Sequence, residues 1–340
     1  MMKRILLLIL LVLPGLSYLK AQTTCTEQLK LTQRSFDDGL LDDIPLLLAD
    51  CMKNGFTKEE KANAYKLLIQ TYLFSEQYQK ADEVMIQFLN EFPSYAIATN
   101  DPKEFVNLHS TYRTKPIFKV EFLGGANFCQ PIVVQSYGVS NIRKVHPNYK
   151  SKLGYTFELN YIDNLYKNIG FSVGSSVTIS NLDYLNNPYD FSTVTAVIKN
   201  TYIGLPMSIR YNYKFKGINL FGKLGIEPNF LLISSIDLTR VDDRAGIEPY
   251  SGTENLLRFH KKFDARPFLA IGTAFNIGRD QMGFSAGFKF STSSLLNMDK
   301  LYSDTYLANK YFYVEDNILM SQAYVAVSYI RSIYKPKKIK

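Results

Sequence analysis

The chain has 340 residues, of which 46% are hydrophobic, 14% aromatic and 21% charged. This composition is too apolar and too aromatic for a disordered protein, and the length allows two domains. Three cysteines and three histidines exclude a disulfide-dense scaffold and a four-cysteine zinc site.

The first residues predict an export signal. Lys3 and Arg4 precede an unbroken apolar run from Ile5 to Leu13, and small residues then lead to Ala21. This is the layout of a secretory signal peptide, with residues 1–21 removed. The alternative, an uncleaved anchor helix, is disfavoured because the run is short for a membrane span. The mature chain carries a net charge of +5, and for such an exported protein we expect no nucleic-acid partner.

Residues 22–115 predict a helical domain. Thr57 and Glu60 form a capping-box pattern ahead of one of its helices. The expected helices cover about Cys25–Gly39, Asp42–Lys53, Lys58–Phe74, Tyr78–Glu91 and Pro102–Tyr112. This part contains 10 basic and 14 acidic residues, against 26 and 17 in residues 116–340, and the opposite net charges indicate two separate modules.

Part of the helical domain resembles a tetratricopeptide repeat. The matching large, small and terminating positions are Tyr65, Leu68, Tyr72, Ala81, Met85 and Pro93. The match covers about 34 residues, too few for a peptide-binding superhelix. A helical bundle with a core of aromatic residues therefore remains an open alternative to a ligand-binding groove.

Two cysteines predict a disulfide bond. Cys25 begins the first expected helix and Cys51 lies near the end of the antiparallel second helix. An antiparallel hairpin brings those ends within disulfide reach, and export places them in an oxidising compartment. A redox-active pair is the less favoured alternative, because the sequence has no Cys-x-x-Cys motif.

From Pro116 onward the hydrophobic period changes to two, which predicts about eight strands in residues 116–340. Four strands alternate clearly, over Gly154–Tyr161, Phe171–Ile179, Ile203–Tyr213 and Gly283–Phe290. Four are less regular, over about Ile117–Phe128, Ile218–Leu232, Arg266–Asn276 and Gln322–Tyr334. Eight strands are the smallest size of a bacterial outer-membrane barrel.

The connections distinguish a membrane barrel from a soluble sandwich. Long ones, at about Pro131–Lys152, Asn181–Asn200, Ser234–Phe263 and Ser291–Met320, alternate with short turns. Short periplasmic turns and long external loops are typical of outer-membrane barrels. The small and polar face of the strands carries Lys119, Glu121, Glu158, Arg210, Lys223, Glu227 and Lys289. We expect these charges to pair inside a filled lumen, with both chain ends and the helical domain in the periplasm. The predicted fold class is therefore α+β multidomain, a helical module followed by an eight-stranded antiparallel transmembrane barrel.

Two segments carry a family resemblance. The signal ending in Ala21-Gln22 and the stretch Tyr202–Tyr211 resemble the PorT-like small outer-membrane β-barrel proteins of Bacteroidetes. The helical module departs from a bare barrel and resembles periplasmic tetratricopeptide-like extensions of such proteins. The resemblance implies type IX secretion or gliding as a candidate pathway. It supplies no catalytic residue.

Few residues suggest chemistry. His109, His146 and His260 lie in different regions, and none has a second ligand at metal spacing. Asp237, Asp242 and Asp243 lack the spacing of a calcium loop. We therefore predict no catalytic site, no metal and no cofactor. The unpaired Cys129 is expected near a strand end, and the basic tail with Lys335, Lys337, Lys338 and Lys340 is expected to contact headgroups or solvent.

These observations favour a non-enzymatic barrel that anchors a periplasmic module, and this module would recruit an envelope protein. The expected partners are outer-membrane lipid, the barrel-assembly machinery during insertion, and an unidentified periplasmic or outer-membrane protein. Three alternatives remain: a barrel that binds surface ligands through its long loops, a small pore, and an enzyme that modifies lipid.

Overall fold

The computed structural model describes residues 24–139, 147–244, 246–278, 280–303 and 305–339. The chain divides into two compact units, one ending at Pro116 and also containing the tail from Tyr334, the other covering Ile117–Ile333. The tail, however, belongs to the helical unit and not to the barrel. The predicted signal peptide and His146 lie outside the described residues.

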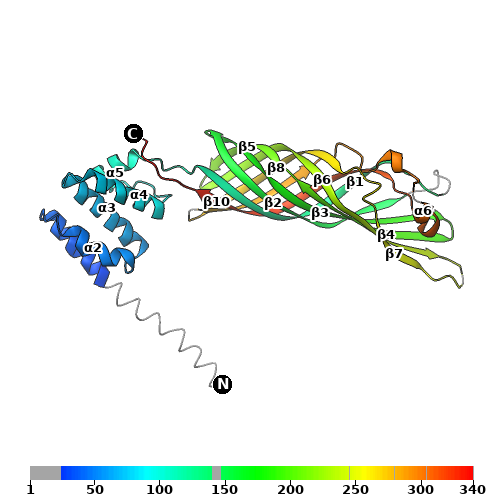
Figure 1. The fold of residues 1–340 in the computed structure, drawn as a ribbon, viewed down its shortest axis with the longest axis horizontal. Coiled ribbons are helices and arrows are strands. Elements are labelled where there is room, and N and C mark those ends of the chain that lie inside the picture. The colour runs from blue at the N-terminus through cyan, green and yellow to red at the C-terminus, as the bar shows by residue number, and fades with distance from the viewer. Residues whose placement is uncertain (1–23, 140–146, 245, 279, 304, 340) are drawn as a thin grey trace, which may run out of the picture. The chain divides into compact units, whose positions relative to one another are not determined.

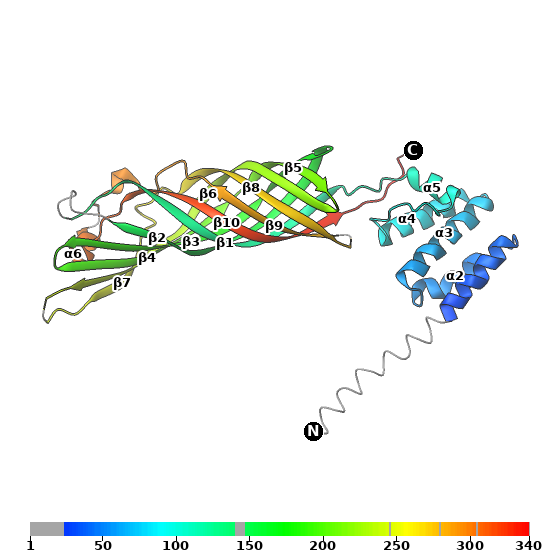
Figure 2. The same cartoon turned by 180° about the vertical axis from the view of Figure 1, so that it is seen from behind.

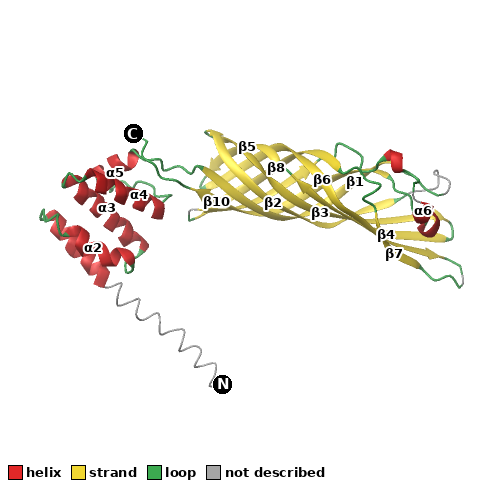
Figure 3. Ribbon diagram, in the orientation of Figure 1, coloured by secondary structure: helices red, strands yellow, loops and turns green. Residues whose placement is uncertain are grey.

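The helical unit follows the sequence prediction closely. Its helices are residues 24–37, α2 Ile44–Lys53, α3 Lys58–Phe74, α4 Tyr78–Glu91 and α5 Lys103–Ser110 (Figure 3). The expected capping box of α3 is present, with the Glu60 amide donating to Thr57 Oγ1 and the Thr57 amide donating to the Glu60 carboxylate. This arrangement satisfies two backbone donors that a helix start would leave without partners.

Two hydrophobic clusters stabilise this unit. One joins α3, α4 and α5 around Phe88 and Phe105, and the other joins α2 to α3 around Ile44 and Leu48. Of the residues that match the repeat pattern, Tyr65, Leu68, Ala81, Met85 and Pro93 are buried and Tyr72 is half-buried. The helices are nevertheless few and short, and the structure does not support a tetratricopeptide module. A small bundle accounts for the same burial. None of the described helices is long and apolar enough to cross a bilayer.

The second unit is a closed antiparallel barrel. The ring runs β1–β2–β3–β4/β5–β6–β8–β9–β10 and closes through β1 and β10 (Figures 1 and 2). Its strands are β1 Phe118–Gln135, β2 Asn148–Tyr166, β3 Ile169–Tyr189, β4 Ser192–Gly204, β5 Met207–Phe215, β6 Ile218–Asp242, β8 Phe263–Ile277, β9 Asp280–Lys289 and β10 Asn317–Ile333. Because β4 and β5 are one ring position interrupted at Leu205 and Pro206, the ring has the eight expected strands.

The barrel is apolar outside and polar inside. Along β3, Phe171, Val173 and Val177 point outward, whereas Ser172 and Ser176 are buried. The same pattern gives the outside exposed Phe, Leu, Ile and Tyr side chains on every ring position. A soluble sandwich buries its apolar face, so this arrangement is the one that a strand wall in lipid requires.

The long connections are folded, which corrects their description as loops. Two of them extend strands β3, β4 and β6, and a third contains α6 Thr305–Tyr311. A further strand, β7 Tyr250–Asn255, pairs with β6. We call these parts the cap, meaning the described residues of 181–200, 234–263 and 291–320. Figures 1 and 2 both place α6, β7 and the start of β4 together at one end of the barrel.

The hydropathy of the strands inverts between the lipid-facing wall and the cap. In β3 the inward side chains change from Ser180 to Leu182 and Tyr184, while the outward side chain at 183 becomes an aspartate. The pleat keeps its phase, so only the chemistry of the two faces is exchanged. The cap therefore has a hydrophobic core of its own, which includes Ile236 and Tyr313.

Candidate functional site

The lumen contains a first charge cluster around Glu121 of β1. Its carboxylate is fully buried and lies 2.7 Å from Lys223 Nζ and 3.4 Å from Arg210 Nη1. The amide of Asn160 donates to the same carboxylate at 3.1 Å. One acidic group thus compensates two cations from neighbouring strands β5 and β6.

A second cluster lies around Lys289 of β9. Its ammonium lies 2.6 Å from Glu227 and 3.1 Å from Glu158, so one cation bridges two carboxylates. Ser176 also donates to Glu227 at 2.5 Å. The seventh predicted charge, Lys119, is less buried and donates to Gln281. The predicted lumen residues therefore face the interior, and six of them pair in two groups.

These pairs fill the barrel. The buried ions need one another, because removing one partner of a buried pair leaves an uncompensated charge and costs about 3–5 kcal/mol. An eight-stranded interior is just wide enough for side chains, and here they interlock across it. This arrangement disfavours the small-pore alternative.

Arg266 of β8 is a further buried cation, which the sequence pattern did not predict. It donates to Asp264 at 2.8 Å, and its guanidinium lies 4.3 Å from the centre of the Tyr202 ring. Arg266 shares the inward parity of Phe268 and Ala270 along its strand. The position of Arg266 at an even spacing from these inward-facing residues could have predicted that its side chain faces the lumen.

The cap contains a chain of buried polar groups that sequence spacing did not reveal. His260 Nδ1 lies 2.9 Å from Ser234 Oγ, and His260 Nε2 faces Glu315 Oε1 at 3.1 Å. The other carboxylate oxygen of Glu315 accepts the Tyr313 hydroxyl at 2.7 Å. Ser234, His260 and Glu315 come from three different parts of the chain, so only the fold brings them together.

The distances in this chain are those of a serine nucleophile with its base, but the protons are arranged differently. Ser234 donates its single hydroxyl proton to Asn200 Oδ1 at 2.6 Å, while the Asn200 amide nitrogen faces Met320. His260 Nδ1 must then supply its own proton and cannot accept one from the serine. Ser234 is also 2% exposed. The group therefore acts as a buried polar link.

A cavity of about 150 Å³ adjoins this link in the cap. Most of its wall is apolar, from residues such as Leu256, Phe259 and Val314, and Glu315 and Tyr313 also line it. Another carboxyl, Asp316, accepts the Tyr137 amide and the Tyr149 hydroxyl, both at 2.7 Å. Burial and the adjacent Glu315 raise the pKa of Asp316 to about 6, although those hydrogen bonds oppose the rise.

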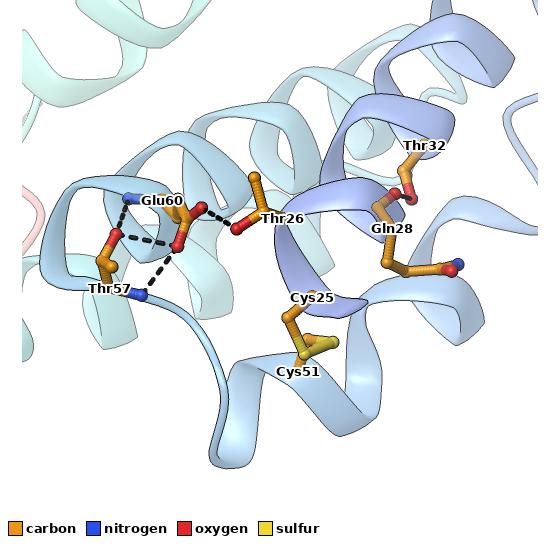
Figure 4. The surroundings of a disulfide bond; sticks show 7 residues. All are labelled: Cys25, Thr26, Gln28, Thr32, Cys51, Thr57 and Glu60. Carbon is orange, nitrogen blue, oxygen red and sulfur yellow. Dashed lines mark hydrogen bonds between the residues drawn. A yellow bond between two sulfur atoms is a disulfide. The ribbon is translucent and has the colours of Figure 1, made fainter. Parts of the chain in front are cut away.

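In the helical unit the predicted disulfide is confirmed. Cys25 and Cys51 are bonded, with their Cα atoms 5.6 Å apart (Figure 4). Beside them, Thr26 donates to the Glu60 carboxylate at 2.5 Å, which joins the first helix to the capping box of α3. This hydrogen bond is the main reason that the pKa of Glu60 is lowered.

The basic tail has a role that the sequence did not predict. Its backbone pairs with the end of the helical segment, where the Arg113 amide donates to the Lys337 carbonyl and the Ile339 amide to the Thr111 carbonyl. Lys338 also forms an ion pair with Asp82 of α4. Within this unit the tail is therefore bound, and neither headgroups nor solvent alone describe its environment.

The remaining candidates form no site for chemistry. His109 is buried among aromatic rings, and burial lowers its pKa. Asp237 pairs with Lys199 and Asp242 with Arg240. Cys129 is buried as a free cysteine. Within the described residues, no group of three or more His, Cys, Asp or Glu side chains is arranged to bind a metal.

Comparison with known proteins finds similarity in solved structures only. No family model matches the chain, and no curated protein does. Neisserial surface protein A is 10% identical, with 64% of this chain and 97% of that chain covered and a TM-score of 0.30. OprG from Pseudomonas aeruginosa is 8% identical, with 64% and 98% covered and a TM-score of 0.33. The outer membrane protease OmpT from Escherichia coli is 8% identical, with 64% and 96% covered and a TM-score of 0.30. The architecture in common is the outer-membrane β-barrel, and neighbours this distant carry no argument about activity.

Proposed function

We propose that this protein is a non-enzymatic outer-membrane barrel whose helical unit lies in the periplasm and recruits a protein partner of the cell envelope. The observation that carries the proposal is the completeness of the helical unit. It has two hydrophobic clusters, a disulfide and a bound tail of its own. The barrel fold does not need such a module, so a separate task explains it best.

The barrel suits the role of an anchor. Its outer wall is apolar and its lumen is filled by ion pairs, so it offers lipid contact without a passage for solutes. The chain connects the two units twice, before Ile117 and after Ile333.

A contact surface for the partner is available on the helical unit. Several large apolar side chains there are exposed, namely Leu31, Leu40, Leu46, Phe74 and Tyr78. Contiguous exposed apolar residues are typical of interaction surfaces, and we propose that these side chains contribute to one. The PorT-like resemblance makes type IX secretion or gliding the first pathway to test.

The test compares two full-length variants after mild crosslinking in cells and purification of the tagged protein. Leu46→Glu combined with Tyr78→Glu charges the helical unit at its most exposed apolar positions. Tyr250→Glu places the same charge on an exposed aromatic residue of β7 in the cap, and is the control. We expect the first variant to lose a partner that both the control and the wild-type protein retain.

Two results would overturn the proposal. One is recovery of the same partner from the helical-unit variant, with loss only in Tyr250→Glu, which would favour a barrel that binds ligands through its cap. The other is a lone protein in every sample, including wild type. Fractionation adds an earlier check, because recovery in the soluble periplasm would exclude the membrane barrel itself.

A further inference from the structure

The cap cavity has the size and walls of a small-ligand site. Its volume of about 150 Å³ equals that of apolar cavities that accept a benzene-sized molecule. Leu256, Phe259, Leu307 and Val314 contribute apolar surface. These residues belong to the cap core, so the walls are held by packing and need not form on binding.

One polar group in this apolar wall is incompletely paired. Glu315 is 7% exposed, and one of its oxygens accepts the Tyr313 hydroxyl. The other oxygen, Oε1, faces His260 Nε2 at 3.1 Å but without the alignment of a hydrogen bond, so neither atom is satisfied. A carboxylate offers about four acceptor positions, and burying it with one aligned donor is costly.

From these observations we propose that the cap cavity binds a small molecule with an apolar body and a primary ammonium group, and that Glu315 is the residue that recognises the ammonium. The apolar body of the ligand would occupy the cavity against its apolar walls, and the ligand's ammonium group would donate to the Glu315 carboxylate. Phe259 and Tyr313 also line the cavity. This inference goes beyond the proposed function, which concerns the helical unit.

The positive charge of Lys300, which also lines the cavity, does not reverse the preference for an ammonium ligand. Lys300 and Tyr302 also line the cavity, and both side chains are exposed. A solvated lysine is screened by water and salt, whereas the buried carboxylate is not. The charge that decides the selectivity is therefore that of Glu315. A ligand carboxylate would have to approach this buried charge of the same sign.

The experiment uses three probes of one size: benzylamine, benzyl alcohol and benzoate. Binding to the full-length protein in lipid nanodiscs is measured by ligand-observed NMR, with empty nanodiscs as the blank. We expect benzylamine to bind about tenfold or more tightly than benzyl alcohol, the gain of one hydrogen bond to a charged group. Benzoate is expected to bind most weakly.

Two variants locate the site. Glu315→Gln keeps the shape and removes the charge, so benzylamine should lose its tenfold advantage over benzyl alcohol. Ala308→Phe fills the cavity from its wall without touching the carboxylate and should abolish binding of both probes. Because this second variant leaves Glu315 intact, the site is still tested if Glu315→Gln fails to fold.

Several results would overturn the proposal. If benzoate bound as tightly as benzylamine, Lys300 and not Glu315 would be the charged residue that recognises the ligand. Unchanged benzylamine binding in Ala308→Phe would place the probe elsewhere. Equal binding of all three probes would leave an apolar cavity with no selectivity for charge, and no binding at millimolar concentration would exclude a ligand site.

Discussion

Lys338 in the C-terminal tail lies 2.6 Å from Asp82 of α4, an ion pair between residues that are 256 positions apart in sequence. Asp82 also accepts the Tyr112 hydroxyl at 2.7 Å, so one carboxylate joins the tail to the end of the helical segment. Residues 22–115 carry a net charge of −4, and the tail contributes four lysines. The tail therefore neutralises the module to which it binds.

Removing residues 335–340 should loosen the end of the helical unit. The deletion removes the backbone acceptor of the Arg113 amide and one partner of Asp82. We expect faster amide hydrogen exchange over residues 111–113, measured by mass spectrometry on the full-length membrane protein. Lys338→Ala is the control, because it keeps the backbone pairing and removes only an exposed ion pair worth about 0.2–1 kcal/mol. Exchange as fast in Lys338→Ala as in the deletion would assign the effect to charge alone.

Loss of the disulfide should destabilise the helical unit and leave the barrel folded. The bond closes a loop with a sequence separation of 26, for which chain entropy gives about 3 kcal/mol. In Cys25→Ser combined with Cys51→Ser, limited proteolysis should cut residues 24–115 at a lower temperature than in wild type. A reductant should lower the cleavage temperature of the wild-type protein to the same extent and leave that of the double variant unchanged. A reductant effect on the double variant would contradict this account.

Much of the fold could be predicted from the sequence, because short sequence patterns determine where its helices and strands begin and end. The helices α3 and α4 have the predicted bounds, since a capping box and a proline delimit them in sequence. All eight ring strands were also predicted, because alternation with period two survives over short segments. The cap was missed although its signal was present: at Ser180 and Leu182 the apolar side chains change faces without a change of pleat. A strand prediction that requires the polar side chains to stay on one face ends the strand where the faces exchange, between Ser180 and Leu182.

Contacts between distant segments could not be derived in this way. Ser234 lies in β6, and His260 and Glu315 lie in the connections that precede β8 and β10, so no spacing rule relates the three residues. The ion pair of Lys338 with Asp82 could not be derived from spacing either, because the two residues are 256 positions apart. The disulfide was predictable only because both cysteines lie on one antiparallel hairpin.

Neutralising Glu121 should destabilise the barrel strongly. In Glu121→Gln, Lys223 and Arg210 lose their buried counter-charge, and breaking such a group costs about 3–5 kcal/mol. Urea unfolding in lipid vesicles, followed by the mobility shift of the unheated barrel on gels, measures the loss. Lys119→Met is the matched control, since Lys119 is less buried and donates to the neutral side chain of Gln281. Equal losses in the two variants would mean that the ion pairs contribute nothing beyond packing.

The buried Ser234 should not react as a nucleophile. Its proton is donated to Asn200, so His260 is not arranged to remove it. A fluorophosphonate probe should therefore leave the native protein unlabelled, as it should the Ser234→Ala variant. Labelling of wild type that disappears in Ser234→Ala would revive the enzyme alternative.

Stability of the cap should fall as pH rises through about 6, because of Asp316. Its pKa in the folded protein is raised to about 6 by burial, above the ordinary value of 3.8. A group with a raised pKa holds its proton more tightly when folded, so its stabilising contribution is complete below 3.8 and is lost as the pH passes 6. The contribution at stake is about 3 kcal/mol or less, from the size of the shift. The Tyr137 amide reports opening of this region, because its hydrogen bond to Asp316 must break before the amide can exchange.

We expect the protection of that amide against hydrogen exchange, corrected for the intrinsic pH dependence of exchange, to be greater at pH 5 than at pH 8. Asp316→Asn mimics the protonated carboxyl and should make protection independent of pH over this range. Asp299→Asn changes an exposed carboxyl of the same cap and should keep the wild-type dependence. If Asp316→Asn kept that dependence as well, the titrating group would have to be another one.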